Sequence, residues 1–270
     1  MSDYLQAVLE NSFLLNAVLA GILASIACGL VGTFVVIKKI SYLSGGIAHA
    51  VLGGVGLALF LGVNPLAGAL VFAVLAAVII GLVKLNVREH EDTIIAAIWS
   101  IGMALGIVFI YLTPGYNIDL MTYLFGNILL VSRLDLLNLI ILDIVVILFV
   151  LVFYRQFIAI SFDDEFSAIR GLQVKLHYII LLILISLSIV VMIRIVGLIL
   201  IIALLTLPAA ISRFFTRTPG SMMAGAVAGG LIFTNLGIFL SYQPGLPPSA
   251  IIIILCGLGY LLTLLIRKKH

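Results

Sequence analysis

The feature that most constrains this chain is a succession of long apolar runs. A helix that spans a lipid bilayer needs about 20 predominantly apolar residues, and turn-forming pairs such as Asn64 with Pro65 separate runs of about that length. The expected spans cover residues 13–37, 43–62, 65–86, 93–113, 134–153, 176–193, 196–214, 220–241 and 248–266. Because the runs are continuous and do not alternate, they favour helices over the strands of a transmembrane β-barrel.

The composition supports the same class. Of the 270 residues, 64% are hydrophobic and only 9% are charged, whereas a soluble domain carries roughly a quarter charged residues. We therefore predict an all-α polytopic membrane protein with about nine transmembrane helices, forming one transmembrane domain over residues 1–270. Segment 120–131 is too short to cross the bilayer and is predicted to be a re-entrant half-helix. The net charge of +3 does not indicate nucleic-acid binding, because the basic residues lie at the ends of apolar runs.

The distribution of lysine and arginine predicts the orientation of the spans. When Lys38 and Lys39 are placed in the cytoplasm, nearly all other basic residues also fall inside, as the positive-inside rule requires. This orientation puts the N-terminus outside and the C-terminus in the cytoplasm. Arg133 and Arg194 are the exceptions, and both fall outside.

Residues 154–175 form a polar segment that this orientation places in the cytoplasm. Ser161, followed three residues later by Asp164, matches a capping box, and Gly171 suits the position just after a helix. We therefore expect a short helix from Ser161 to Gly171, within a functional segment at 160–175.

One face of this short helix is apolar, and the helix also carries a run of three acidic residues. Phe162, Phe166 and Ile169 recur at the spacing of a single helix face. An acidic run is poorly suited to an anionic lipid surface, so a protein partner is favoured, with an interfacial helix on lipid as the alternative. The acidic residues are Asp163, Asp164 and Glu165.

A histidine lies in span 43–62 among residues with almost no side chain. Gly45, His49 and Gly53 share one helix face. An ionisable group inside a span is a functional hypothesis by default, and neutral imidazole is the commonest metal ligand. The alternative is a histidine that is hydrogen-bonded to a carbonyl of a neighbouring helix. The adjacent column is a small-xxx-small series that allows close helix contact, and it consists of Gly46, Ala50, Gly54 and Ala58.

Two further residues inside spans are unusual. Pro208 predicts a kink in span 196–214, and a kinked helix near a glycine-lined helix suits a transport pathway, although a static kink is an equal alternative. We expect Pro208 to line such a pathway together with Gly45 and Gly53. Asp143 is a secondary candidate, because an acid within a span needs a partner or water.

Three stretches resemble the permease subunit of the zinc/manganese (ABC-3) family of metal ABC importers, in the order and spacing of that family. They are KKISYLSGGIAHAVLGGVGLAL at 38–59, SFDDEFSAIRGL at 161–172 and VGLILIIALLTLPAAISR at 196–213. The resemblance implies a permease with the fold of the vitamin B12-type importers, in a prokaryotic plasma membrane. It also implies a second copy of the chain, a cytoplasmic ATP-binding subunit and an extracytoplasmic metal-binding protein.

The resemblance also implies roles for particular residues. In the family, an Asp and a His one helical turn apart on the second helix coordinate the metal. The His position corresponds to His49, and Gly45 stands at the Asp position. Since manganese favours carboxylate ligands, the absence of a carboxylate at position 45 favours zinc as the transported ion. Segment 160–175 is expected to couple the permease to its ATPase. Arg133 and Arg194 are expected either to dock the binding protein or to contact lipid headgroups.

Three alternatives stay open at this point. An importer for iron or an iron chelate would have a wider pathway that does not need a histidine. A secondary transporter would hold more acidic residues in its spans. An intramembrane enzyme would need a second catalytic group near His49. The chain has no Walker, HExxH or nucleophile-elbow sequence, so we expect no catalytic residue and no permanently bound cofactor, with the metal ion as the transported substrate.

Overall fold

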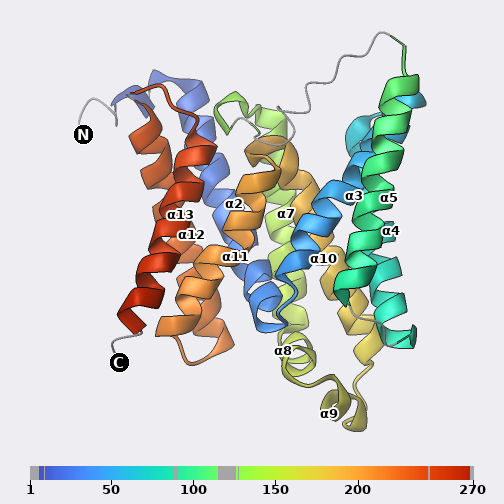
Figure 1. Ribbon diagram of the computed structural model, residues 1–270. Helices are drawn as coiled ribbons and strands as arrows, with labels where there is room; N and C mark the ends of the chain where they lie inside the picture. Colours follow the sequence, from blue (N-terminus) through green and yellow to red (C-terminus); the bar gives the residue numbers. More distant parts are fainter. Residues whose placement is uncertain are drawn as a thin grey trace. The chain divides into compact units, whose positions relative to one another are not determined.

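The structure is a computed structural model that describes residues 6–8, 10–87, 91–114, 126, 128–242 and 244–267. Within these ranges the chain is helical and has no β-strand (Figure 1). Nine helices in the described ranges are long and apolar enough to span a membrane, which confirms the predicted class. They are α2 (Ser12–Ile37), α3 (Ser41–Phe60), α4 (Pro65–Val87), α5 (Glu91–Leu112), α7 (Arg133–Val152), α10 (Val174–Val196), α11 (Leu198–Phe215), α12 (Pro219–Tyr242) and α13 (Pro248–Arg267).

The spans are helical because only internal hydrogen bonding satisfies the backbone inside lipid. Three of them, α4, α12 and α13, begin at a proline, namely Pro65, Pro219 and Pro248. Proline suits the first helical position, because the amide hydrogen that it lacks would have no partner there. The half-helix predicted at 120–131 lies largely outside the described residues. Its described part contains the single 3₁₀ turn η1 (Ile128–Leu130).

The chain divides into two compact units, each built from segments that are distant in sequence. Unit 1 comprises Met1–Val36, Met121–Phe149 and Met192–His270. Unit 2 comprises Ile37–Leu120 and Val150–Val191. That residues 1–270 act as one domain stays a prediction.

In unit 1, α11, α12 and α13 pack against one another, and glycines bring α2 against α11 and α12. A Cβ atom on Gly32 would collide with the carbonyl of Leu205 on α11, and one on Gly29 would collide with the backbone of Val227 on α12. Ser25 of α2 also lies 3.3 Å from Thr234 of α12, oxygen to oxygen. Small residues therefore let the backbones of unit 1 approach closely.

In unit 2, α3 packs against both α4 and α5 (Figure 1). A Cβ atom on Gly54 would collide with the Gly68 carbonyl of α4, and one on Gly56 would lie 2.6 Å from the Gly106 carbonyl oxygen of α5. On the predicted small-residue column, Ala50 touches α5 through Gly102. The prediction that this column mediates close helix contact is confirmed.

The polar segment of unit 2 forms two short helices where one was expected. They are α8 (Tyr154–Phe162) and α9 (Asp164–Ile169). The capping-box prediction at Ser161 is wrong: its hydroxyl donates to the Phe157 carbonyl inside α8, at 2.6 Å. Asp163 caps α9 instead, accepting from the Phe166 amide at 2.9 Å. A carboxylate one residue before the helix is a strong N-cap, and it breaks the segment at that point.

The predicted end of this segment is confirmed. Gly171 follows α9 with φ +82°, a left-handed conformation that glycine adopts without steric cost. Its amide donates to the Ala168 carbonyl, and the Leu172 amide donates to the Ser167 carbonyl. These two bonds form a Schellman motif, which gives α9 a defined end.

Candidate functional site

His49 lies on α3 of unit 2, half-buried, with its ring stacked on that of Trp99 from α5. The ring centroids are 4.4 Å apart and the planes differ by 5°. The Nδ1 atom of His49 is buried and has no hydrogen-bond partner among the described residues. The alternative of a bond from Nδ1 to a neighbouring carbonyl is therefore not observed. A buried ring nitrogen without a partner is able to accept a proton or bind a metal.

Neighbouring side chains also hold Trp99 in place. Sequence reasoning did not identify Trp99 as part of this site. Its Nε1 atom lies 2.9 Å from the Met103 sulfur, one turn further along α5, and the Tyr42 ring is centred 5.8 Å from its own. The indole is thereby held against His49 from α5. The available signal was that Trp99 is the only tryptophan of the chain, but its pairing with His49 depends on how α3 and α5 cross.

The two glycines flanking His49 differ in their surroundings. A Cβ atom on Gly53 would lie 2.8 Å from the Gly102 carbonyl oxygen, so Gly53 lies at the contact of α3 with α5. This close approach places Gly53 in a contact between two helices, and its predicted role in lining a pathway stays a prediction. Gly45 is partly exposed, and its place beside a pathway stays a prediction.

No larger set of metal ligands surrounds His49 within the described ranges. There, no group of three or more His, Cys, Asp and Glu side chains could hold a metal ion. In unit 2, His49 thus offers a single imidazole from this chain.

Two other candidates lie in unit 1. Asp143 of α7 is buried, and its two carboxylate oxygens have no hydrogen-bond partner among the described residues. Pro208 is buried within α11, which continues through it to Phe215. A Cβ atom on Gly229 of α12 would lie 3.6 Å from the Pro208 Cβ atom. The structure therefore assigns Pro208 to the contact of α11 with α12, and a role in lining a pathway stays a prediction.

The predicted coupling residues form an exposed apolar surface on α9 and the end of α8. Phe162 is 69% exposed, Phe166 53% and Ile169 84%. The guanidinium of Arg170 lies 4.8 Å from the centre of the Phe166 ring. Large apolar side chains that protrude from a polar segment are typical of a surface that another molecule covers.

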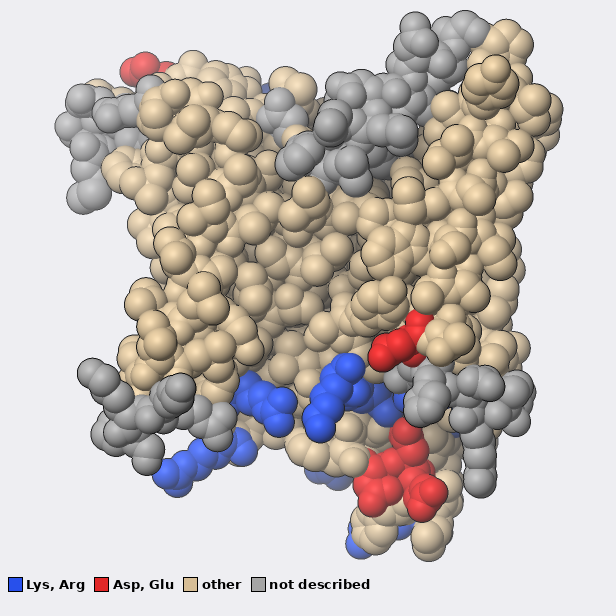
Figure 2. Space-filling model, in the orientation of Figure 1, with Lys and Arg blue, Asp and Glu red and all other residues tan. Residues whose placement is uncertain are grey.

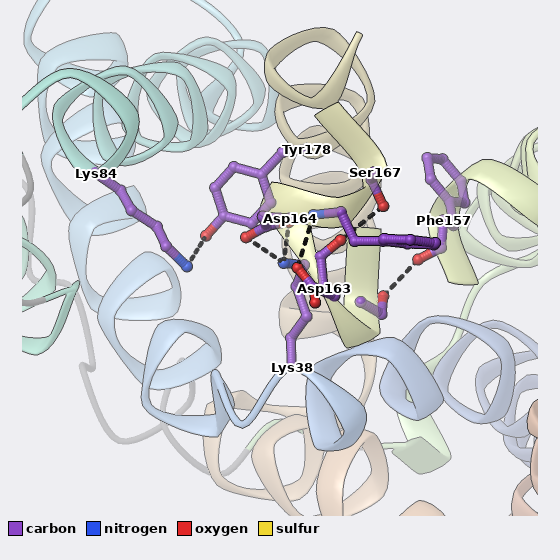
Figure 3. Close-up of polar contacts among 9 residues, drawn as sticks. Lys38, Lys84, Phe157, Asp163, Asp164, Ser167 and Tyr178 are labelled. Carbon is purple, nitrogen blue, oxygen red and sulfur yellow. Dashed lines mark hydrogen bonds and ion pairs between the residues drawn. The ribbon is translucent and has the colours of Figure 1, made fainter. Parts of the chain in front are cut away.

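The acidic residues beside this surface have different surroundings. Asp163 caps α9, and Glu165 is exposed. Asp164 accepts from Lys38 at 3.1 Å and 3.3 Å, one distance to each carboxylate oxygen (Figure 3). Figure 2 shows acidic side chains gathered where α9 lies, with basic side chains beside them. Sequence reasoning treated Lys38 as a topology signal and missed this ion pair, because its partner is distant in sequence.

The two arginines predicted to lie outside belong to unit 1. Arg133 is exposed at the start of α7. The Nε atom of Arg194, near the end of α10, lies 3.8 Å from a carboxylate oxygen of Asp135. Asp135 also accepts from the Ser132 hydroxyl at 2.6 Å. Arg194 thus has a partner within the chain while its side chain remains 59% exposed.

Among the described residues, nine helices are long and apolar enough to span a membrane. One of them carries an imidazole whose buried Nδ1 atom has no hydrogen-bond partner in that part of the chain, and α9 exposes an apolar surface on the polar segment. Together these features define an integral membrane protein. Comparison with known proteins narrows this class. The model of the ABC 3 transport family matches residues 10–267. The chain therefore belongs to the ABC 3 transport family and is the permease of a metal ABC importer.

Individual relatives agree with this assignment. A probable metal transport system membrane protein of Chlamydia muridarum is 41% identical, over 95% of this chain and 89% of that protein. The manganese import system permease protein ScaB of Streptococcus gordonii is 33% identical, over 100% of this chain and 97% of that protein. In a solved structure of PsaBC from Streptococcus pneumoniae in complex with Fab, the matched chain has a TM-score of 0.85 and 31% identity, covering 97% of this chain and 94% of that one.

Proposed function

We propose that this permease carries a divalent transition-metal ion across the membrane past His49, driven by ATP hydrolysis in a separate cytoplasmic subunit. The observation that carries the proposal is the His49 imidazole, whose buried Nδ1 atom has no hydrogen-bond partner among the described residues. Neutral imidazole is a good ligand for such ions. The stack on Trp99 supports the proposal, because it holds the ring in one plane.

The single imidazole also supports the proposal of a homodimer. One neutral nitrogen is a weak site by itself, since metal sites in proteins combine several ligands. Two copies of the chain related by a twofold axis would bring two His49 rings to one pathway. The ion would then be passed on by a pair of histidines without a carboxylate at position 45.

The exposed surface of Phe162, Phe166 and Ile169 is proposed to seat in a groove of the ATPase subunit. A short helix with protruding aromatic side chains suits a hydrophobic groove. Asp163 and Glu165 lie next to this surface, and in the proposal they set the register of docking against basic residues of the partner. The proposed orientation has the N-terminus outside, so that α8 and α9 face the cytoplasm.

Two observations bear on the identity of the metal. Relatives that match the whole chain at 32–33% identity are manganese permeases by name, which makes manganese the first candidate. Gly45 provides no carboxylate one turn before His49, which favours zinc, because manganese prefers oxygen ligands. The proposal therefore covers the divalent transition-metal class, with these two ions as the candidates.

Uptake in proteoliposomes tests the proposal. The permease would be reconstituted with its ATPase subunit and its extracytoplasmic binding protein, and radioactive manganese or zinc would be supplied to the binding protein. We expect saturable uptake of one of these ions that requires ATP and all three proteins. Two outcomes would overturn the proposal. One is uptake of an iron chelate but of neither divalent ion, and the other is uptake of a divalent ion at the same rate with and without ATP.

A further inference from the structure

The ion pair between Lys38 and Asp164 joins two parts of unit 2 that the proposed function assigns to different tasks. Lys38 lies in the turn just before α3, the helix that carries His49, and Asp164 is the first residue of α9 (Figure 3). We infer that Lys38 is a positioning residue that transmits movement of α9 to α3. This inference rests on the proposed coupling role of α9.

The pair is built as a firm contact. The Lys38 side chain is only 6% exposed, and its ammonium group reaches both oxygens of the Asp164 carboxylate. A charge-assisted contact of this kind is stronger than a hydrogen bond between neutral groups, and it connects α9 directly to the turn from which α3 begins. A partner that moves α9 therefore acts on α3 through this contact.

The surroundings of Lys38 hold it in place. Its ammonium group lies 4.8 Å from the centre of the Tyr178 ring, and the Lys84 ammonium group lies at the same distance from that ring. Tyr178 is buried at the start of α10, and its hydroxyl lies 3.5 Å from the Lys84 nitrogen. Two cations near one ring repel each other, and the Asp164 carboxylate offsets part of this repulsion by its ion pair with Lys38.

The turn and the helix that follow are stiff enough to pass on a displacement. Lys39, next to Lys38, has φ +60°, a conformation that fixes a tight turn into α3. His49 lies about two turns into that helix. Because Gly53 and Gly54 bring α3 into backbone contact with α5 and α4, α3 moves together with its neighbours instead of bending alone. A shift at Lys38 is thereby carried to the His49 ring.

Transport per ATP hydrolysed is the measurement that tests this inference. Lys38→Met keeps the length of the side chain and removes the charge. With the reconstituted ATPase and binding protein, we expect it to lower metal transported per ATP by about tenfold, the usual size of a coupling between sites. The affinity for the ATPase subunit should stay near the parent value. Arg213→Met, which removes an exposed positive charge on α11, is the control and should behave as the parent does.

A charge exchange separates coupling from folding. Lys38→Asp combined with Asp164→Lys restores an ion pair in reverse, and we expect it to recover part of the transport lost in each single variant. If Lys38→Met does not yield folded protein, Asp164→Asn on the more exposed partner provides the same test. Equal transport per ATP in the parent and the variant, or no recovery in the exchange, would overturn the inference. A parent complex that imports no divalent metal would overturn the proposed function instead.

Discussion

The imidazole of His49 lies flat against the indole of Trp99, with ring centroids 4.4 Å apart and planes 5° apart. Because Trp99 is the only tryptophan of the chain, its fluorescence reports on the surroundings of His49. A metal ion bound at the imidazole places positive charge beside the indole, and we expect a saturable change in the fluorescence of the purified permease on addition of manganese or zinc. In His49→Gln the change should disappear. A change of equal size in that variant would show that the ion acts elsewhere.

The crossing of α3 with α4 predicts a large effect of a single methyl group. In Gly54→Ala the new Cβ atom would meet the Gly68 carbonyl, and overpacking of this kind costs about 1–3 kcal/mol. We expect a lower midpoint of thermal unfolding in detergent. Gly257→Ala on α13 is the matched control, because a Cβ atom there meets nothing within 4 Å. Alanine is also the better helix former, so this control should equal or exceed the parent, and a Gly54→Ala protein as stable as the control would contradict the packing account.

Phe166→Ala tests the surface proposed to bind the ATPase subunit. Burial of one large apolar side chain stabilises a complex by about 1.5–3 kcal/mol, so its loss should weaken association about ten- to hundredfold. Because Phe166 is 53% exposed, the permease itself should remain folded. Leu151→Ala, an exposed position on α7, provides the control. Affinity for the ATPase that is unchanged in Phe166→Ala would move the coupling role to another segment, with residues 87–92 the next candidate.

Arg133 and Arg194 test the proposed docking of the binding protein. We expect the double charge reversal, Arg133→Glu with Arg194→Glu, to lower the affinity for the metal-loaded binding protein at low salt. Surface ion pairs contribute at most about 1 kcal/mol each, so the loss of two should lower the affinity about thirtyfold or less, and the effect should fade as salt is added. Since Arg194 also lies 3.8 Å from Asp135, Arg133→Glu alone separates docking from a local effect. Unchanged affinity at low salt would favour contact with lipid headgroups.

The spans were predictable because they depend on composition alone. The predicted run 65–86 became α4 (Pro65–Val87), and 248–266 became α13 (Pro248–Arg267). The close contacts of Gly54 were predictable for a similar reason, since the spacing of small residues determines which helix face allows a close approach.

Contacts between distant segments were not predictable in the same way. The break between α8 and α9 was missed because Asp163, not Ser161, took the capping position. Both residues suit a cap, and which one caps depends on the path of the chain around it. The stack of Trp99 on His49 and the Lys38–Asp164 pair depend on the crossing of helices, to which the local pattern gives no guide.

The central claim is that His49 takes part in moving the metal ion, and uptake by a His49→Gln permease tests it most directly. Parent and variant would be reconstituted in equal amounts with the ATPase subunit and the binding protein, after unfolding measurements establish that both are folded. Glutamine keeps a polar side chain but lacks the imidazole nitrogen that binds metal. We predict that the variant folds, binds its ATPase and loses most metal uptake, whereas a folded variant with uptake equal to the parent would contradict the claim.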